Sequence, residues 1–154
     1  MSSVMFVCHG NICRSPMAEF VFRDMAERAG IEVEAASSAI SSEEIFCGVG
    51  NPVYPPVREI LNSRGIDCSG KRATLLRKSD YEKYDRIIVM DGSNLRGVMR
   101  IFGGDPENKV SRLLDYTGRG GDVADPWYTR DFAVTERDID EGCRGLLEAL
   151  KREK

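Results

Sequence analysis

Residues 4–16 have the sequence VMFVCHGNICRSP, in which an apolar run leads into a short loop and a Ser-Pro pair. A continuous apolar run of this length predicts a strand that is buried on both faces, as in parallel sheets. Proline is tolerated at the first position of a helix. The apolar residues that follow recur at helical spacing until Gly30, and they are Ala18, Val21, Phe22, Met25 and Ala29. The segment therefore predicts a strand, a loop and a helix in succession.

The rest of the chain continues this alternation. We predict further strands over residues 31–37, 86–90 and 110–114, a loop over residues 41–54, and helices over residues 55–65, 91–102 and 139–150. Such alternation is typical of the α/β class, and it predicts one domain over residues 1–154: a doubly wound, four-stranded parallel sheet flanked by helices. Ligands bind these sheets at the carboxyl ends of the strands, so the loop after Val7 is the first candidate site.

The composition excludes several classes of function. Lysine and arginine number 22 and aspartate and glutamate 25, so the net charge of -3 provides no basic field for binding nucleic acid. No apolar run approaches the ~20 residues of a membrane span, and the first residues do not resemble a secretion signal. We therefore expect a cytoplasmic protein without membrane insertion. The five cysteines lack the spacing of a disulfide framework or a metal site, so reduced thiols and no metal are expected.

Cys8 and Arg14 bracket a tight loop at the start of the first predicted helix. A loop wrapped at a helix N-terminus directs several backbone N–H groups inward, and with the helix dipole they form a cradle for a dianion. The planar guanidinium of Arg14 matches two phosphate oxygens at once. The same positive surroundings favour the thiolate of Cys8, which is the nucleophilic form. An anion site and a nucleophile are therefore predicted to coincide.

Other residues fit the same chemistry. Gly10 and Asn11 belong to the residue types that accept the left-handed backbone conformation that such a loop needs. The hydroxyl of Ser15 is available to donate a hydrogen bond to the sulfur. A thiolate that attacks phosphorus must expel an oxygen leaving group, and this step needs a proton donor. Asp125, the first residue of the sequence DPWY, is the candidate for that donor.

The cysteine loop near the start of the chain and the DPWY sequence near its end resemble the low-molecular-weight protein tyrosine phosphatases, over nearly the whole chain. The resemblance implies hydrolysis of phosphotyrosine monoesters through a phosphocysteine intermediate, without a cofactor. It implies that Cys8 is the nucleophile, that Arg14 binds phosphate, and that Asp125 is the general acid and then the general base. The implied partners are tyrosine-phosphorylated proteins or aryl phosphates, with phosphate as product and inhibitor.

The resemblance also implies roles for the surrounding residues. The phosphate-binding loop is expected to comprise Cys8, His9, Gly10, Asn11, Ile12, Cys13, Arg14 and Ser15. Cys13 is expected to form a reversible disulfide with Cys8 that protects it from over-oxidation, which would make the enzyme redox-sensitive. Trp127 and Tyr128 are expected at the substrate rim. Phe46, in the segment that corresponds to the family's variable rim, is a further rim candidate.

Three positions leave alternatives open. His9 stands where leucine is frequent in the family, so it either makes the pocket more polar and contacts substrate or faces solvent. Lys71 stands where many members have a histidine that supports the phosphate loop, and this support is therefore in question. Tyr128 is either a phosphorylation site, as adjacent tyrosines are in some members, or a packed side chain.

Other functions use a similar loop. Arsenate reductases of this fold need two further redox cysteines in a mobile segment, whereas Cys68 stands alone in the corresponding region. Protein arginine phosphatases of the family tend to have threonine where this chain has Ile12, which favours tyrosine-type substrates here. A phosphopeptide-binding module would need neither Cys8 nor Asp125. Nucleotide binding lacks support, because the first turn has no G-x-G-x-x-G or Walker pattern.

Overall fold

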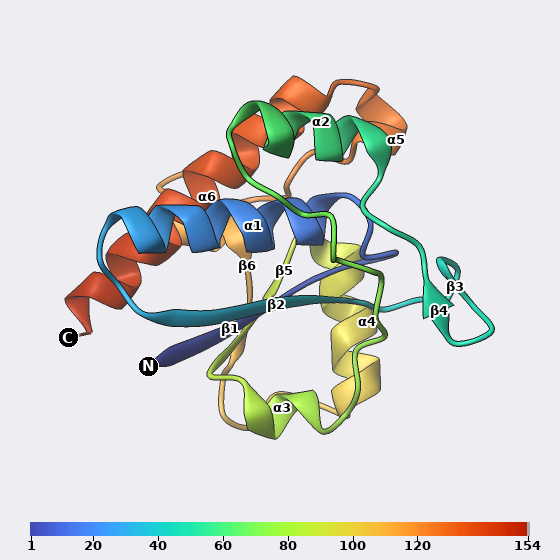
Figure 1. The fold of residues 1–154 in the computed structure, drawn as a ribbon. Helices are drawn as coiled ribbons and strands as arrows, with labels where there is room; N and C mark the ends of the chain where they lie inside the picture. The colour runs from blue at the N-terminus through green and yellow to red at the C-terminus, as the bar shows by residue number, and fades with distance from the viewer. Residues whose placement is uncertain (154) are drawn as a thin grey trace.

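The computed structural model describes residues 1–153 and contains a four-stranded sheet. Its strands, in spatial order, are β2 Val33–Ala39, β1 Ser2–Cys8, β5 Arg86–Val89 and β6 Val110–Arg112. Every neighbouring pair is parallel (Figure 1). The predicted four-stranded parallel sheet is thus confirmed.

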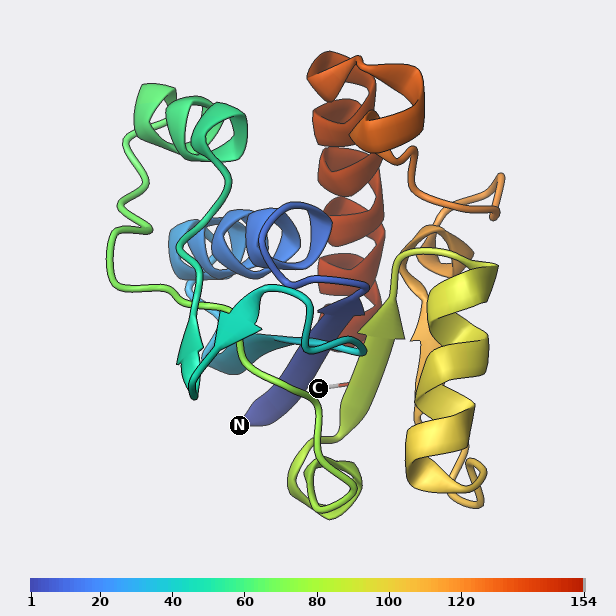
Figure 2. The ribbon, with the colours of Figure 1, turned by 90° about the vertical axis from the view of Figure 1, so that its right-hand side faces the viewer.

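Helices cover both faces of the sheet (Figure 2). They are α1 Arg14–Arg28, α2 Pro55–Ser63, α3 Asp80–Lys83, α4 Gly92–Phe102, α5 Pro126–Thr129 and α6 Phe132–Arg152. Successive side chains of β1 point to opposite faces. Val4 and Phe6 therefore join the core with α1 and α6, whereas Met5 and Val7 join the core with α3 and α4. None of the helices within residues 1–153 combines the length and the apolarity that a membrane span needs.

Several element boundaries differ from the prediction, among them β2, which spans Val33–Ala39 rather than residues 31–37, and two of the differences have a clear physical reason. The strand predicted over residues 110–114 ends at Arg112, because Leu113 and Leu114 begin a short 3₁₀ helix, η1 Leu113–Tyr116. Both leucines are fully buried, and a short buried apolar run does not distinguish the two conformations. The last helix begins at Phe132, seven positions before its predicted apolar stripe, because Asp131 accepts hydrogen bonds from the first backbone N–H groups and caps the helix there.

The segment predicted as a loop over residues 41–54 contains a small hairpin. Its antiparallel strands are β3 Ile45–Phe46 and β4 Val49–Gly50. Cys47 and Gly48 form the turn with φ values of 51° and 78°, the left-handed pair that two-residue hairpin turns favour. The short helices α3 and α5 were likewise absent from the sequence prediction, because four residues are too few to display a helical period.

The strand order reverses around β1, which has β2 on one side and β5 on the other. In doubly wound sheets, ligands bind in the crevice outside the carboxyl ends of the strands at such a reversal. Cys8 is the last residue of β1, and Asp91 follows the last residue of β5 by two positions. The fold therefore brings the loop after Cys8 next to the start of α4.

Candidate active site

A cavity of about 350 Å³ opens at the carboxyl ends of β1 and β5. Residues 8–14 of the predicted phosphate loop line it, together with Asp125, Trp127 and Tyr128 from far along the chain. Ser15 lies beside Cys8 at the start of α1, fully buried. The structure therefore brings together the loop and the DPWY sequence that the sequence analysis singled out separately.

The thiol of Cys8 is buried at the end of β1 and faces the N-terminus of α1. Its Sγ lies 3.0 Å from Oγ of Ser15 and 3.4 Å from the backbone nitrogen of Ser15, which donates to it. Hydrogen-bond donors and the positive end of a helix both stabilise a thiolate relative to a thiol. The surroundings of Cys8 thus suit the charged form of the sulfur.

Asn11 and Thr74 determine the direction of the Ser15 hydroxyl. Nδ2 of Asn11 donates to Oγ of Ser15 at 2.8 Å, and the backbone N–H of Thr74 donates to Oδ1 of Asn11 at 3.0 Å. Because an amide nitrogen only donates, the Ser15 oxygen accepts from Asn11 and its own hydrogen remains for the sulfur of Cys8. Asn11 has a φ of 59°, so its predicted left-handed conformation is confirmed.

Gly10 does not have the conformation predicted for it. Asn11 is left-handed but Gly10 is not, so that expectation was wrong for the glycine. A Cβ atom at Gly10 would lie 3.2 Å from Cγ of Glu44, which is closer than side chains normally approach. A side chain at Gly10 would require Glu44 to shift by a few tenths of an ångström, so the glycine eases the close approach of the loop to the segment that precedes β3.

The backbone N–H groups of the loop are available as hydrogen-bond donors. Within the described residues 1–153, the N–H groups of residues 10–13 have no protein acceptor, and no side chain caps α1 at Cys13. Free N–H groups at a helix N-terminus bind anions such as phosphate. No group of three or more histidine, cysteine, aspartate or glutamate side chains in the same residues is arranged to hold a metal ion. The site suits a dianion.

The guanidinium of Arg14 is buried beside the cavity and held by three groups from later in the chain. Nη1 donates to the carbonyl oxygen of Val123 at 3.0 Å and pairs with Oδ2 of Asp91 at 3.0 Å, while Nη2 lies 3.4 Å from Oδ2 of Asp125. Burial disfavours the cation, but the negative charges of Cys8, Asp125 and Asp91 outweigh it and raise the pKa of Arg14. Arg14 is therefore a fixed positive charge.

Asp91 is a site residue that the sequence pattern did not identify. It is the N-cap of α4, where one carboxylate oxygen accepts from the backbone N–H of Asn94 at 2.8 Å while the other pairs with Arg14. An aspartate before a helix is an ordinary cap, so its residue type carries no further signal. Only its place after the neighbouring strand, at the same edge of the sheet, points to the site.

Asp125 is the N-cap of α5. Its Oδ1 accepts from the backbone N–H of Trp127 at 3.0 Å, Pro126 occupies the first helical position, and Oδ2 faces Arg14. The side chain is 23% exposed and lines the cavity. The cap thus orients one oxygen away from the cavity groups and leaves the other beside the guanidinium.

Cys13 lies in the same loop as Cys8 but has different surroundings. Burial, and next the negative charge of Cys8, raise the pKa of the Cys13 thiol to about 12, against the lowering effect of Arg14. Cys13 is therefore protonated at neutral pH. Both cysteines line the cavity and both are free thiols, so their disulfide stays a prediction.

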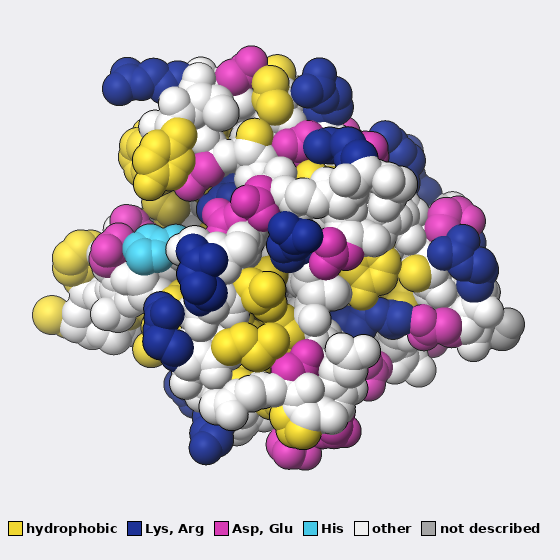
Figure 3. All heavy atoms as spheres, turned by 180° about the vertical axis from the view of Figure 1, so that it is seen from behind, with side chains coloured by type: hydrophobic (Ala, Val, Ile, Leu, Met, Phe, Trp, Pro, Cys, Tyr) yellow, Lys and Arg dark blue, Asp and Glu magenta, His cyan; other side chains and the backbone are white. Residues whose placement is uncertain are grey.

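The rim of the cavity is partly as predicted. Trp127 and Tyr128 line it, and Tyr128 is 87% exposed, so the packed alternative for this tyrosine was wrong. Phe46 is exposed on β3 and is not among the residues that line the cavity, so its place at the substrate rim stays a prediction. His9 lines the cavity while exposed, with Nε2 3.0 Å from Oε2 of Glu43; the histidine, cyan in Figure 3, has acidic neighbours.

Lys71 supports the loop only through other residues. Its Nζ donates to the carbonyl oxygen of Ser37 at 2.8 Å and lies 3.9 Å from Oε1 of the buried Glu19. Burial lowers the pKa of Lys71, and Glu19 partly opposes this. Thr74 also donates to the Ser37 carbonyl, and its own N–H binds Asn11. The direct support of Asn11 thus comes from the backbone three residues after Lys71.

Comparison with known proteins shows the family to which the chain belongs. The sequence model named Low molecular weight phosphotyrosine protein phosphatase matches residues 3–154. The chain belongs to this family. It is 40% identical to the low molecular weight protein-tyrosine-phosphatase YfkJ of Bacillus subtilis over 100% of this chain and 99% of that protein. It is 42% identical to the low molecular weight phosphotyrosine protein phosphatase of Schizosaccharomyces pombe over 81% of this chain and 80% of that protein.

Solved structures of the family have the same fold as this phosphatase. The crystal structure of YfkJ superimposes with a TM-score of 0.92 at 39% identity, covering 100% of this chain and 97% of that one. The YwlE arginine phosphatase superimposes with a TM-score of 0.84 at 29% identity, covering 99% of this chain and 97% of that one. Family membership makes the chain a cysteine-dependent protein tyrosine phosphatase, an enzyme of the hydrolase class.

Proposed function

We propose that this phosphatase hydrolyses phosphotyrosine monoesters of proteins, with Cys8 as the nucleophile, Arg14 as the phosphate-binding cation and Asp125 as the general acid and base. The observation that carries the proposal is the convergence of these three groups. All line one cavity, with the Arg14 guanidinium 3.4 Å from the Asp125 carboxylate and the Cys8 sulfur against the N-terminus of α1.

In the first step, the phosphate of the substrate binds the loop N–H groups and the guanidinium of Arg14. The Cys8 thiolate attacks phosphorus, a sulfur–phosphorus bond forms, and the bond between phosphorus and the tyrosine oxygen breaks. Asp125, protonated in the substrate complex, gives its proton to the departing oxygen, so that tyrosine leaves as the neutral phenol. Arg14 and the loop donors stabilise the charge on the transferring group.

In the second step, a water molecule attacks the phosphocysteine. Asp125, now a carboxylate, takes a proton from that water, and the sulfur–phosphorus bond breaks. The Ser15 hydroxyl donates to the departing sulfur, because a thiolate carries no proton and only accepts, while the Ser15 oxygen itself accepts from Asn11. Phosphate and the original thiolate result. Since phosphate binds the same donors as the substrate, it is also expected to inhibit.

The walls of the cavity support an aryl substrate. Ile12 and the rings of Trp127 and Tyr128 line it above the polar loop, and flat apolar side chains pack well against a phenol ring. The YwlE arginine phosphatase shares the fold, so phosphoarginine is the substrate to compare. A guanidinium substrate is cationic and planar, and the apolar side chain of Ile12 offers it no hydrogen-bond acceptor.

The test is a comparison of three peptides of one sequence that carry phosphotyrosine, phosphoserine or phosphoarginine. We expect kcat/KM to be highest for phosphotyrosine in reducing, metal-free buffer, and we expect no turnover in Cys8→Ser. Cys47→Ser removes an exposed thiol outside the cavity and is the matched control that keeps full activity. A higher kcat/KM for phosphoarginine, or undiminished turnover in Cys8→Ser, would refute the proposal.

The mechanism also requires a reducing compartment, and we propose the cytoplasm, where thiols are kept reduced.

We further propose that an oxidant such as hydrogen peroxide converts the thiols of Cys8 and Cys13 to a disulfide, with the peroxide reduced to water. A dithiol reductant would then restore both thiols. Recovery of activity after peroxide treatment should fall in Cys13→Ser, because Cys8 would then oxidise further.

A further inference from the structure

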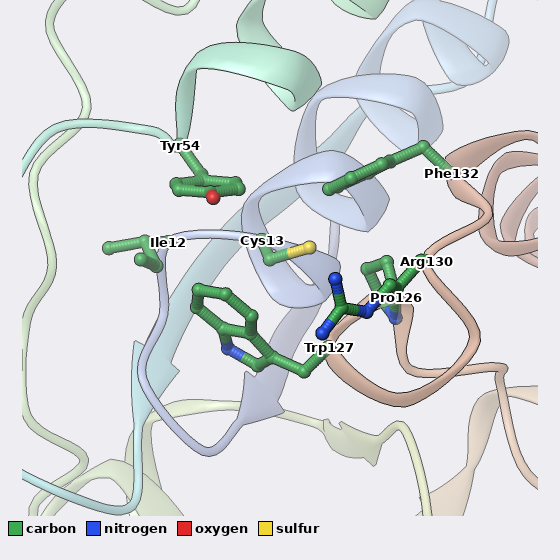
Figure 4. A pocket seen from close by; sticks show the side chains of 7 residues that line it. All are labelled: Ile12, Cys13, Tyr54, Pro126, Trp127, Arg130 and Phe132. Atoms are coloured by element: carbon green, nitrogen blue, oxygen red, sulfur yellow. The ribbon is translucent and has the colours of Figure 1, made fainter.

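A second cavity of about 340 Å³ lies beside the first. The rings of Tyr54, Trp127 and Phe132 surround it (Figure 4), with the Tyr54 ring centre 5.4 Å from that of Trp127 and 6.1 Å from that of Phe132. Ile12, Cys13 and Trp127 line both cavities. The second cavity is therefore an aromatic pocket that shares a wall with the catalytic cavity.

Among the residues that the structure describes, 1–153, Arg130 is the only charged one that lines this aromatic pocket. Its side chain extends from the turn between α5 and α6, and its guanidinium faces the space between the rings (Figure 4). Within the described residues 1–153, no carboxylate pairs with it, whereas Arg14, the arginine that lines the catalytic cavity, is paired with Asp91 and Asp125. The pocket thus combines apolar walls with a free planar cation at its edge.

The placement of the pocket fits a peptide that extends from the catalytic cavity. In an extended peptide, side chains two positions apart point in the same direction, and their Cα atoms are about 7 Å apart. A phosphotyrosine held by the loop therefore directs the side chain two positions away toward the same face of the enzyme. The Trp127 ring, which both cavities share, separates the two side chains.

We propose that the aromatic pocket selects the substrate peptide, an inference that rests on the proposed function. The pocket takes an apolar side chain two positions from the phosphotyrosine, and Arg130 binds a carboxylate on the residue three positions from it. The charges around the two cavities support this direction of the bound peptide. Glu43 and Glu44 line the catalytic cavity but not the aromatic pocket, so an acidic residue is repelled at their side and attracted at Arg130.

The experiment measures kcat/KM for phosphotyrosine peptides of one length. One set carries Leu or Ser two positions after the phosphotyrosine and Glu or Gln three positions after it, and a second set mirrors these positions on the N-terminal side. We expect Leu to exceed Ser by about tenfold in one of the two sets, which is the usual gain of a small apolar group in a pocket. Glu should exceed Gln by about threefold in the same set.

Variants separate the two parts of the pocket. Arg130→Gln should abolish the preference for Glu and leave the preference for Leu, whereas Phe132→Ser should reduce the preference for Leu. Arg137→Gln is the matched control: it removes an exposed arginine of α6 that lines neither cavity, and both preferences should persist. If Phe132→Ser fails to fold, the effect of Arg130→Gln on the preference for Glu tests the proposal by itself. Equal kcat/KM across both sets, or a Glu preference that survives Arg130→Gln, would overturn the proposal.

A substrate without flanking residues distinguishes this proposal from the function on which it rests. 4-Nitrophenyl phosphate fills only the catalytic cavity, so Arg130→Gln should hydrolyse it at the wild-type rate. A slower rate would mean that Arg130 acts on the phosphate site, which contradicts the pocket. No turnover of 4-nitrophenyl phosphate or of any peptide by the wild type would refute the proposed function itself, and the pocket proposal with it.

Binding can also be followed without turnover. Trp127 is the only tryptophan of the chain and lines both cavities, so its fluorescence reports on each. In Cys8→Ser, titration with the favoured peptide should give a dissociation constant about tenfold below that of the peptide with Ser in place of Leu. Equal dissociation constants for the two peptides would count against the pocket.

Discussion

Cys8 and Cys13 lie five positions apart in one loop, but their surroundings have opposite effects on the ionisation of a thiol. Cys8 receives donors from Ser15 at the N-terminus of α1, whereas Cys13 is held in its neutral form by burial and by the charge of Cys8. Ionisation of both thiols would place two negative charges beside each other, so the proposed mechanism uses one thiolate, that of Cys8. The raised pKa of Cys13 is consistent with the role proposed for it, as the partner of Cys8 in a disulfide.

The raised pKa of Cys13 predicts its reactivity toward alkylating agents. In Cys8→Ser, where burial still acts on Cys13, its rate of alkylation by iodoacetamide should rise about tenfold per pH unit from pH 7 to pH 10 without levelling, because only the thiolate reacts. Peptide mass spectrometry measures this rate against that of the exposed Cys47. A rate for Cys13 that reaches a plateau below pH 9 would contradict the assignment.

Asp125 should matter most when the leaving group is poor. Asp125→Ala removes the proposed proton donor, so hydrolysis of phenyl phosphate should slow by about 10²-fold or more, while 2,4-dinitrophenyl phosphate, whose phenolate leaves unaided, should slow far less. Steady-state kinetics at pH 6 measure both. Asp131→Ala, which removes the cap of α6 without a contact to Arg14, should leave both rates unchanged. Equal slowing of the two substrates by Asp125→Ala would argue against an acid.

At the scale of elements, helix caps position the charges of the site. Asp91 caps α4 and Asp125 caps α5, and each uses one carboxylate oxygen for its helix and the other for Arg14. Because a capping bond fixes the side-chain torsions, both free oxygens have a set direction before any ligand binds. The guanidinium is therefore held in one orientation before any ligand binds, which suits the phosphate binding that we propose for it.

Two substitutions of Asp91 separate its two contacts. Asn retains a cap but carries no charge for Arg14, whereas Ala loses both. We expect Asp91→Asn and Asp91→Ala to lower kcat/KM for 4-nitrophenyl phosphate by at least tenfold, because Arg14 loses its anchor. Urea unfolding should show Asp91→Ala to be less stable than Asp91→Asn by about 1 kcal/mol. Wild-type kcat/KM in Asp91→Asn would show that the ion pair is dispensable.

At the scale of the whole molecule, the reversal of strand order gathers segments that are far apart in the chain. The loop after β1, the cap after β5 and the DPWY sequence before α6 meet at one edge of the sheet. The helices on both faces bury the strands and so hold this edge rigid. A ligand bound there should stabilise the entire fold, because it contacts groups from three segments.

Inorganic phosphate should therefore raise the melting temperature. At 100 times its dissociation constant, a ligand that binds only the folded state adds about 2.7 kcal/mol to the free energy of unfolding. Calorimetry should detect this shift in the wild type and in Cys8→Ser, which keeps the loop donors and Arg14. Arg14→Ala should lose most of it. Absence of a shift in Cys8→Ser together with its presence in Arg14→Ala would refute the assigned anion site.

The sequence alone was sufficient to predict the four-stranded sheet and the position of the loop that lines the cavity. The run before Cys8 and the helical spacing after Pro16 are local patterns, and a strand, loop and helix unit forms from contacts within one stretch of chain. The cysteine, arginine and serine of the loop also carry their chemistry in their residue types. Asn11 could be assigned a left-handed conformation because few residue types accept it.

Contacts between distant segments were decided only by the tertiary structure. Asp91 and Thr74 carry ordinary residue types, and their bonds to Arg14 and Asn11 join positions more than sixty residues apart. The left-handed conformation predicted for Gly10 was wrong, because the glycine instead makes room for Glu44, which lies in another loop. Phe46 and the aromatic pocket depend on how the hairpin and α5 pack. Local patterns determine local conformation, whereas packing determines which side chains meet.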